Sequence, residues 1–269
     1  GAILCGCGGD PMNSSKDGAL VIIELSAASG ELEIKAEDRK AKKAINDVKV
    51  SPAQDAVAVA SEDGRCYIHD IRDLSLRTVC AKVASTIRTL DWSEDGKYLA
   101  GTTRSFDTVW FDASDGTLVA TPAAVRDVAF ATTTSPLGYR TQGLWPAIDD
   151  GADIQSVDVS KDGLLVAKGD DHGHIEVGFF PCTQRKTMLP APGHGSHVSK
   201  VRFTCDRAHL ITTGVFSRAI IQYCLHPLGV NKDGVGVVVT PDRDLPPHAS
   251  LAREKIGDEG DQGEEKKKE

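Results

Sequence analysis

The sequence predicts an all-β fold of the propeller type, in which small antiparallel sheets stand around a common axis. The first observation is a motif that recurs four times: an alternating strand, a polar turn and a strand of mostly small apolar residues. The second is the spacing of these turns, which begin at residues 51, 93, 160 and 204 and lie 42, 67 and 44 residues apart. A period of about 40–45 residues with several strands per unit is typical of WD40-type blades. The third is a set of Asp-Gly turns, which supply the positive φ that tight hairpins require.

The two strands that flank each turn differ in composition. The strand before the turn is expected at 45–50, 87–92, 154–159 and 198–203. The strand after it is expected at 56–60, 98–101, 164–167 and 209–212. Inner strands of a blade are buried on both faces, which explains why the second set carries small or β-branched residues without strict alternation. A single blade cannot bury both of its faces, so the blades must pack side by side.

Residues 1–228 are therefore predicted to form the propeller portion of the chain. Its units are expected at roughly 1–36 (a partial blade), 44–83, 86–121, 125–190 with an insertion, and 197–226. This division gives about four full blades plus partial ones. Because propellers close with typically four to eight blades, the remaining strands are expected upstream of Gly1 or in another chain.

The longest interval between turns contains extra material from residue 125 to residue 153. It includes one more candidate strand at 125–130, then a Thr-rich loop and the motif Gly143-Leu-Trp-Pro146. We interpret this stretch as a degenerate or partial blade. The alternative is a long loop, which would be unusual in a compact domain unless it had a role.

The composition changes after about residue 228. Residues 229–253 are expected to form an extended linker, in which 235–239 could add one strand. Residues 254–269 consist of Glu, Asp, Lys, Gly and Gln with almost no apolar residue, so they cannot bury enough surface to offset their chain entropy. We expect a disordered charged tail, which could be a solvating extension or a binding segment.

Charge and hydropathy exclude several classes of partner. The formal net charge is −8, and no basic stripe of the kind that nucleic-acid binding needs is present. Polybasic attraction to a membrane is equally unsupported. No run of about 18 apolar residues predicts a transmembrane helix, and no signal peptide is visible. We therefore expect neither nucleic acid nor a membrane as a partner.

Catalysis, metals and cofactors are not expected either. The seven cysteines are odd in number and form no Cys-x-x-Cys pair, which indicates buried free thiols in a reducing compartment. There is no Walker loop, dinucleotide fingerprint, Gly-x-Ser-x-Gly or His-Glu-x-x-His motif. The carboxylates cluster in turns, without a base or nucleophile beside them. The sequence predicts a protein that is not an enzyme.

Several polar residues are expected to hold the blades together. Aspartates at turns accept backbone N–H bonds and fix the turn, and this role is predicted for Asp63, Asp95, Asp170 and Asp171. A histidine in a Gly-His blade opening usually bonds within its own blade, and this role is predicted for His194 and His197. No third ligand is obvious beside these two histidines, so a metal site is not expected.

The candidates for partner binding are cationic or aromatic. The basic ones are Arg39, Lys40, Lys42 and Lys43 between two blades, and Arg185 with Lys186. A run of this kind is often only a solvated loop. Trp145 could anchor the irregular segment or lie exposed for a partner.

The order of several motifs carries a family resemblance. Residues 89–99 contain Asp-Trp-Ser-Glu-Asp-Gly, and Gly143-Leu-Trp-Pro146, Phe180-Pro-Cys182 and Ser196-His-Val198 follow in that order. Together they resemble the C-terminal WD40 propeller of echinoderm microtubule-associated protein-like (EMAP-like) proteins, over about residues 36–226. One departure is Gly214-Val-Phe-Ser217, where the family keeps an acidic turn, so this turn should be looser or should contact something. Tyr223 stands where the family has Trp.

The resemblance implies the C-terminal part of a larger tandem-propeller protein. It implies a noncatalytic microtubule-associated protein that binds tubulin, microtubules or axonemal proteins, with the upstream propeller half of the same protein as a further partner. The implied location is the cytoplasm and cytoskeleton, including the ciliary or flagellar axoneme. The alternative is a general WD40 scaffold for signalling or ciliary complexes without direct tubulin contact.

Overall fold

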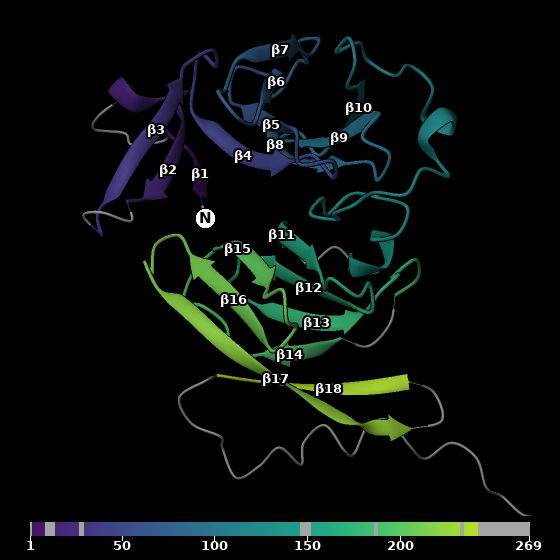
Figure 1. Cartoon of the computed structure of the whole chain (residues 1–269). Coiled ribbons are helices and arrows are strands. Elements are labelled where there is room, and N and C mark those ends of the chain that lie inside the picture. Colours follow the sequence, from purple (N-terminus) through teal and green to yellow (C-terminus); the bar gives the residue numbers. More distant parts are fainter. Residues whose placement is uncertain are drawn as a thin grey trace, which may run out of the picture.

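Nearly all the regular secondary structure in the described part of the chain is antiparallel β-sheet. The computed structural model describes residues 2–8, 14–26, 30–145, 152–185, 188–231 and 234–241. Within them it contains five separate sheets, each built from strands that are consecutive in the sequence. Figure 1 shows the first three sheets in the upper half of the molecule and the last two in the lower half. The all-β propeller prediction is confirmed.

Two sheets have three strands and three sheets have four. The first sheet contains β1 (Ala2–Gly6), β2 (Leu20–Leu25) and β3 (Leu32–Asp38). The second contains β4 (Ile45–Val50), β5 (Ala56–Ser61), β6 (Cys66–Asp70) and β7 (Leu76–Val79). The third contains β8 (Ile87–Trp92), β9 (Tyr98–Thr103) and β10 (Thr108–Asp112). The fourth contains β11 (Ile154–Val159), β12 (Leu165–Asp170), β13 (Ile175–Phe179) and β14 (Leu189–Ala191). The fifth contains β15 (Val198–Phe203), β16 (His209–Gly214), β17 (Ile220–Asn231) and β18 (Gly234–Pro241). Three short 3-10 helices complete the described part, η1 (Ser14–Lys16), η2 (Pro122–Val125) and η3 (Gln142–Leu144).

In each of the four blades where the repeated turn was predicted, its Ser or Thr hydroxyl accepts the backbone N–H five residues on and donates to an aspartate, which lies two residues on in three turns and four residues on in the second blade. In the third blade the Ser93 hydroxyl donates to the Asp95 carboxylate at 2.6 Å and accepts the backbone N–H of Tyr98 at 2.9 Å. Ser160 makes the same two bonds, to Asp162 and from the N–H of Leu165. Equivalent bonds join Ser51 to Asp55 and Ala56, and Thr204 to Asp206 and His209.

Neighbouring blades share apolar cores. Every residue of β5 is buried, as expected for an inner strand covered on both faces. Ala58 and Ile68 of the second blade pack with Leu90, Leu99 and Phe111 of the third. In the lower half, an equivalent core joins the fourth and fifth blades. Small side chains such as Ala58 alternate here with large ones such as Phe111, so that the facing sheets interdigitate.

Side chains on the inner strands also bond to the next blade along the chain. The Asp47 carboxylate accepts the backbone N–H of Leu90 at 2.9 Å, and the Asp158 carboxylate accepts that of Phe203 at 2.8 Å. Asp91 accepts the N–H of Thr134 at 3.0 Å in the same way. Residues near 134 therefore occupy the place of a next inner strand, although they form none.

The structure corrects the candidate strand expected at 125–130. No strand is present at 125–130: η2 ends at Val125, and the only pairing there is an isolated bridge between Phe130 and Ser93. The sheet strands of this unit begin at β11. Val125 is buried while Arg126 and Asp127 are exposed, so the alternating pattern reflects one packed turn rather than a strand.

The C-terminal boundary also differs from the expected one. β17 continues past residue 228, and β18 pairs with it across part of the stretch that was expected to be a linker. The strand suggested at 235–239 thus exists within β18. The charged tail at 254–269 lies outside the described residues.

No helix in the described ranges is long and apolar enough to cross a membrane. Within the same ranges, no three His, Cys, Asp or Glu side chains gather as a metal site.

Candidate interaction surfaces

The propeller has two faces that differ in the loops they carry. On the first, the loops that connect successive sheets bond to neighbouring loops through the backbone, for example Glu62 N–H to Ala44 O at 2.9 Å and Val215 N–H to His197 O at 2.9 Å. We call this the connector face. The second carries the four Ser/Thr–Asp turns, and there Ala113 N–H donates to Lys97 O at 2.8 Å. We call it the turn face.

The basic cluster predicted between the first two blades lies on the connector face. Arg39, Lys40, Lys42 and Lys43 are all exposed in the loop between β3 and β4. The Arg39 Nε donates to the Asp17 carbonyl at 2.9 Å, and the Lys40 ammonium lies 3.9 Å from an Asp38 carboxylate oxygen. Among the described residues, the ammonium groups of Lys42 and Lys43 have no carboxylate partner.

Asp63 shapes this loop from the neighbouring blade. Its carboxylate accepts the backbone N–H of Lys42 at 3.0 Å, that of Arg65 at 3.0 Å and the Tyr67 hydroxyl at 2.7 Å. Burial, together with the nearby Asp63 carboxylate, raises the pKa of the Tyr67 hydroxyl, so the hydroxyl stays a donor. The lysines are thus presented on a braced loop, which lowers the conformational entropy lost on binding.

The other candidates lie elsewhere. Arg185 is exposed in the loop between β13 and β14, which belongs to the turn face because Phe180 N–H donates to Leu164 O there at 2.9 Å. Lys186 lies outside the described residues. Trp145 is half-buried, and its Nε1 donates to the Pro136 carbonyl at 2.9 Å. The structure does not bring the three candidates together on one surface.

The structural residues predicted at turns lie in bonded positions. The Asp170 carboxylate accepts the His174 backbone N–H at 2.8 Å, and the Asp171 carboxylate accepts that of Asp153 at 2.9 Å. Asp95 accepts the N–H of Lys97 at 3.1 Å in addition to its bond with Ser93.

His194 is buried at the opening of the fifth blade. Its Nε2 lies 2.8 Å from the Thr212 hydroxyl, and its Nδ1 lies 3.3 Å from the Ser217 hydroxyl. Burial lowers the pKa of His194, which favours the neutral ring. The ring of His197 instead contacts Phe216 edge to face at 5.6 Å between centroids.

Sequence reasoning missed an exposed apolar group beside His197 on the connector face. Phe216 is 73% exposed and Ile220 76%, with Val215 next to them also exposed. We call Val215, Phe216 and Ile220 the Phe216 patch. The signal in the sequence was the replacement of an acidic turn by Gly214-Val-Phe-Ser217, although exposure of the phenyl ring could not be read from it.

Comparisons with known proteins show which family has this architecture. Residues 2–225 match the family model of the "Echinoderm microtubule-associated protein second beta-propeller". This chain belongs to the echinoderm microtubule-associated protein family. It is similar to echinoderm microtubule-associated protein-like 1 of Rattus norvegicus, with 32% identity over 181 residues, 65% of this chain and 22% of the relative. The 77 kDa echinoderm microtubule-associated protein of Strongylocentrotus purpuratus is 33% identical over 181 residues, 65% of this chain and 26% of the relative.

The chain therefore spans about a quarter of the length of these EMAP-like relatives. Echinoderm microtubule-associated protein-like 3 of Mus musculus matches over a longer stretch, with 32% identity over 212 residues, 76% of this chain and 23% of the relative. Among solved structures, the β-propeller domain of Myceliophteria thermophila Cps50 (Swd1) aligns with a TM-score of 0.50 and 13% identity, over 83% of this chain and 65% of that one. The latter likeness concerns the fold alone.

Proposed function

We propose that this chain is part of a noncatalytic microtubule-associated protein and that its connector face binds the microtubule lattice. The observation that carries the proposal is its membership of a family whose relatives are named for microtubule association. The corresponding location is the cytoplasm and its cytoskeleton, with the axoneme as one microtubule population.

Electrostatics select the surface. The surface of a microtubule is acidic and this chain carries a net charge of −8, so attraction requires a local basic face. The cluster of Arg39, Lys40, Lys42 and Lys43 provides one, since all four side chains are exposed and Asp63 braces their loop. Rim charges of this kind act chiefly on the association rate and on salt dependence.

Co-sedimentation with stabilised microtubules across a salt series tests the proposal. We expect salt-sensitive pelleting, and reversal of all four basic residues to Glu should abolish it. The double reversal Lys42→Glu with Lys43→Glu should weaken binding at least tenfold. Its matched control is Lys97→Glu with Lys161→Glu, which reverses two exposed lysines on the turn face and should leave binding nearly unchanged.

Equal losses in the two double variants would mean that only net charge matters, and would remove this loop as the contact. Unchanged pelleting of the fourfold variant would do the same. No pelleting of the folded protein at low salt would contradict direct lattice binding.

A scaffold without tubulin contact is the second candidate. The Phe216 patch favours it, because exposed aromatic and aliphatic side chains together are typical of protein-binding sites. Affinity for such a partner should be insensitive to salt and should fall on Phe216→Ser. Loss of microtubule pelleting on Phe216→Ser, with the basic cluster intact, would assign the patch to the lattice contact instead.

We also propose that another structural unit packs against the exposed face of the first sheet. β1–β3 packs one face against the second blade, while Ile3, Leu25, Leu32 and Ile34 are 54–64% exposed. In a propeller such a face belongs against another blade. This supports an upstream propeller half as a partner of the chain. Limited proteolysis should therefore cut β1–β3 of this chain alone faster than in a longer protein that includes the preceding sequence.

A further inference from the structure

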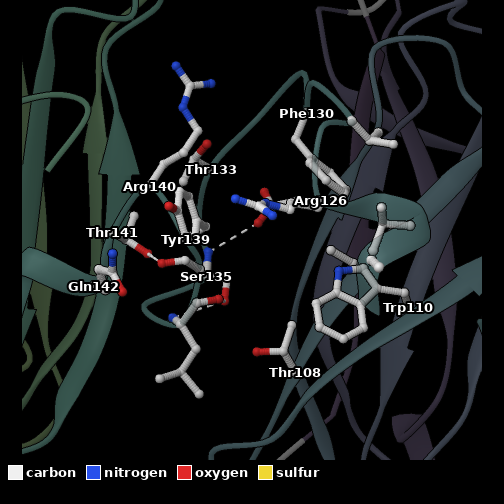
Figure 2. Close-up of a pocket in the computed structure, with 17 residues that line it drawn as sticks. Thr108, Trp110, Arg126, Phe130, Thr133, Ser135, Tyr139, Arg140, Thr141 and Gln142 are labelled. Carbon is white, nitrogen blue, oxygen red and sulfur yellow. Dashed lines mark hydrogen bonds between the residues drawn. The ribbon is translucent and has the colours of Figure 1, made fainter. Parts of the chain in front are cut away.

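A cavity of about 570 Å³ lies beside the third blade, where the chain departs most from a regular propeller. One wall is the face of β9 and β10, with Ala100, Thr108 and Trp110. The other is the irregular segment that follows η2, including Phe130 and Tyr139. Figure 2 shows Trp110 and Thr108 on one side and Tyr139 on the other, with Arg126 reaching between them. The volume of the cavity lies within the usual range for ligand pockets, about 300–1,000 Å³.

The strand registers explain why this wall is uncovered. Trp110 pairs with Ala100 as Ile68 pairs with Ala58 in the second blade and Val177 with Ala167 in the fourth. Ile68 and Val177 are 3% and 1% exposed, because the next blade packs on them. Trp110 is only half-buried. The surface that lines the cavity is therefore one that elsewhere in this molecule is covered by polypeptide carrying apolar side chains.

A next blade would cover this wall, but only the part of it that contacts β8 is present. Residues 129–135 still run along β8, with Glu94 N–H donating to Ala129 O and Ala131 N–H to Trp92 O, both at 2.8 Å. Beyond them, the described residues up to 145 form no further strand. The space that a blade's outer strands would fill is the cavity.

The polar groups around the cavity define its ligand. Among the described residues, the indole N–H of Trp110 and the hydroxyls of Thr108 and Thr133 have no hydrogen-bond partner. Figure 2 shows the indole nitrogen of Trp110 facing the space between the walls. These groups suit the carbonyl and N–H groups of a polypeptide backbone. The cavity is therefore lined as a peptide site would be, with apolar walls and a few unused polar groups.

The charge at the mouth selects the kind of peptide. Arg126 is exposed, its guanidinium lies 5.8 Å from the centroid of the Tyr139 ring, and no described carboxylate pairs with it. Arg140 instead lies over the Phe180 ring at 4.6 Å. Asp91 lies at the inner wall, and its carboxylate accepts bonds from Thr132, Thr134 and Ser135. Because this wall already holds a carboxylate, an acidic group of a ligand belongs at the mouth, next to Arg126.

We propose that this cavity binds an extended acidic peptide, whose aromatic or branched side chain packs on Trp110 and whose carboxylate pairs with Arg126. The site lies apart from the basic cluster on the β3–β4 loop. It is therefore separate from the proposed microtubule contact. A result that contradicts one of the two proposals does not contradict the other.

Fluorescence anisotropy with three labelled hexapeptides tests the proposal. The probes are Asp-Glu-Phe-Glu-Leu-Glu, its basic counterpart Lys-Lys-Phe-Lys-Leu-Lys, and Asp-Glu-Ala-Glu-Ala-Glu, which replaces the two large apolar side chains by methyl groups. We expect the first to bind at least tenfold more tightly than the other two. Arg126→Glu should lower its affinity at least tenfold, whereas the exposed control Lys161→Glu should not.

The variant Trp110→Leu keeps an apolar side chain like those of Ile68 and Val177, so it should fold, and it should still lose most of the binding. Equal binding of the three peptides, or equal effects of Arg126→Glu and Lys161→Glu, would overturn the proposal. So would no binding of the acidic aromatic peptide by the folded protein.

Discussion

The carboxylate of Asp91 accepts the backbone N–H of Thr134 at 3.0 Å, although these residues belong to no common sheet. The same relation joins Asp47 to Leu90 and Asp158 to Phe203, where both partners lie on regular inner strands. The chain has therefore kept the inter-blade bond at a place where it has lost most of the blade. This bond holds the irregular segment against the third sheet and so shapes the cavity.

We expect Asp91→Asn to destabilise the fold and loosen residues 132–135 in particular. Asp91 is 3% exposed and accepts bonds from two backbone N–H groups and two hydroxyls, some of which an amide cannot satisfy. Leaving a buried donor unsatisfied costs about 1–3 kcal/mol of unfolding free energy. Urea unfolding measures the loss, and hydrogen exchange at Thr134 and Ser135 locates it. Asp95→Asn, on an exposed turn, is the control and should cost less; equal costs would contradict the account.

Gly169→Ala should destabilise the contact between the fourth and fifth blades. A Cβ at Gly169 would lie 2.5 Å from Val198 Cγ1 and 2.8 Å from Val198 Cβ. Overpacking of this kind costs typically about 1–3 kcal/mol. At Gly195 an added Cβ meets nothing within 4 Å, so Gly195→Ala should change the midpoint of urea unfolding little. A neutral Gly169→Ala would show that the two sheets can separate without cost.

The stability of the fold should depend on His194 between about pH 7 and pH 5. Burial lowers the pKa of His194 in the folded protein, whereas an unfolded histidine titrates near 6.5. As the pH falls through 6.5, the unfolded state binds more protons, so the free energy of unfolding decreases. His194→Gln removes this contribution, and its unfolding free energy should fall less over the same pH range. Urea titrations at several pH values measure the slope. The control is His172→Gln, which makes the same substitution at an exposed histidine.

Trp145→Phe should weaken the irregular segment without unfolding the propeller. The substitution removes the N–H bond to the Pro136 carbonyl, worth about 1 kcal/mol, while keeping an aromatic ring against Phe106. Trp145→Ala should cost more, since it also empties the packed site. Thermal unfolding compares the two. If neither variant lowers the melting temperature, Trp145 does not anchor the segment, and the alternative role as a partner contact is favoured.

Most of the sheet framework could be predicted from the sequence because it depends on local patterns. Alternation at 45–50 and small residues at 56–60 correspond to β4 and β5, and the Ser/Thr–Asp turns bond as their residue types suggest. Asp63 and His194 could be assigned structural roles for the same reason. The segment at 125–130 could not, since its alternation does not reflect a strand: η2 ends at Val125, and Phe130 forms only an isolated bridge with Ser93.

The sequence by itself determined the propeller class, the position of the turns and the family to which the residues point. Only the tertiary structure decided which candidates share a face, because loops that are far apart in the sequence become neighbours when the sheets stack. In the structure, Lys42 and Arg185 lie on different faces, Trp110 is only half-buried and Phe216 is exposed. Exposure depends on what packs from the next blade, and that is decided by the packing of the sheets rather than by any local pattern.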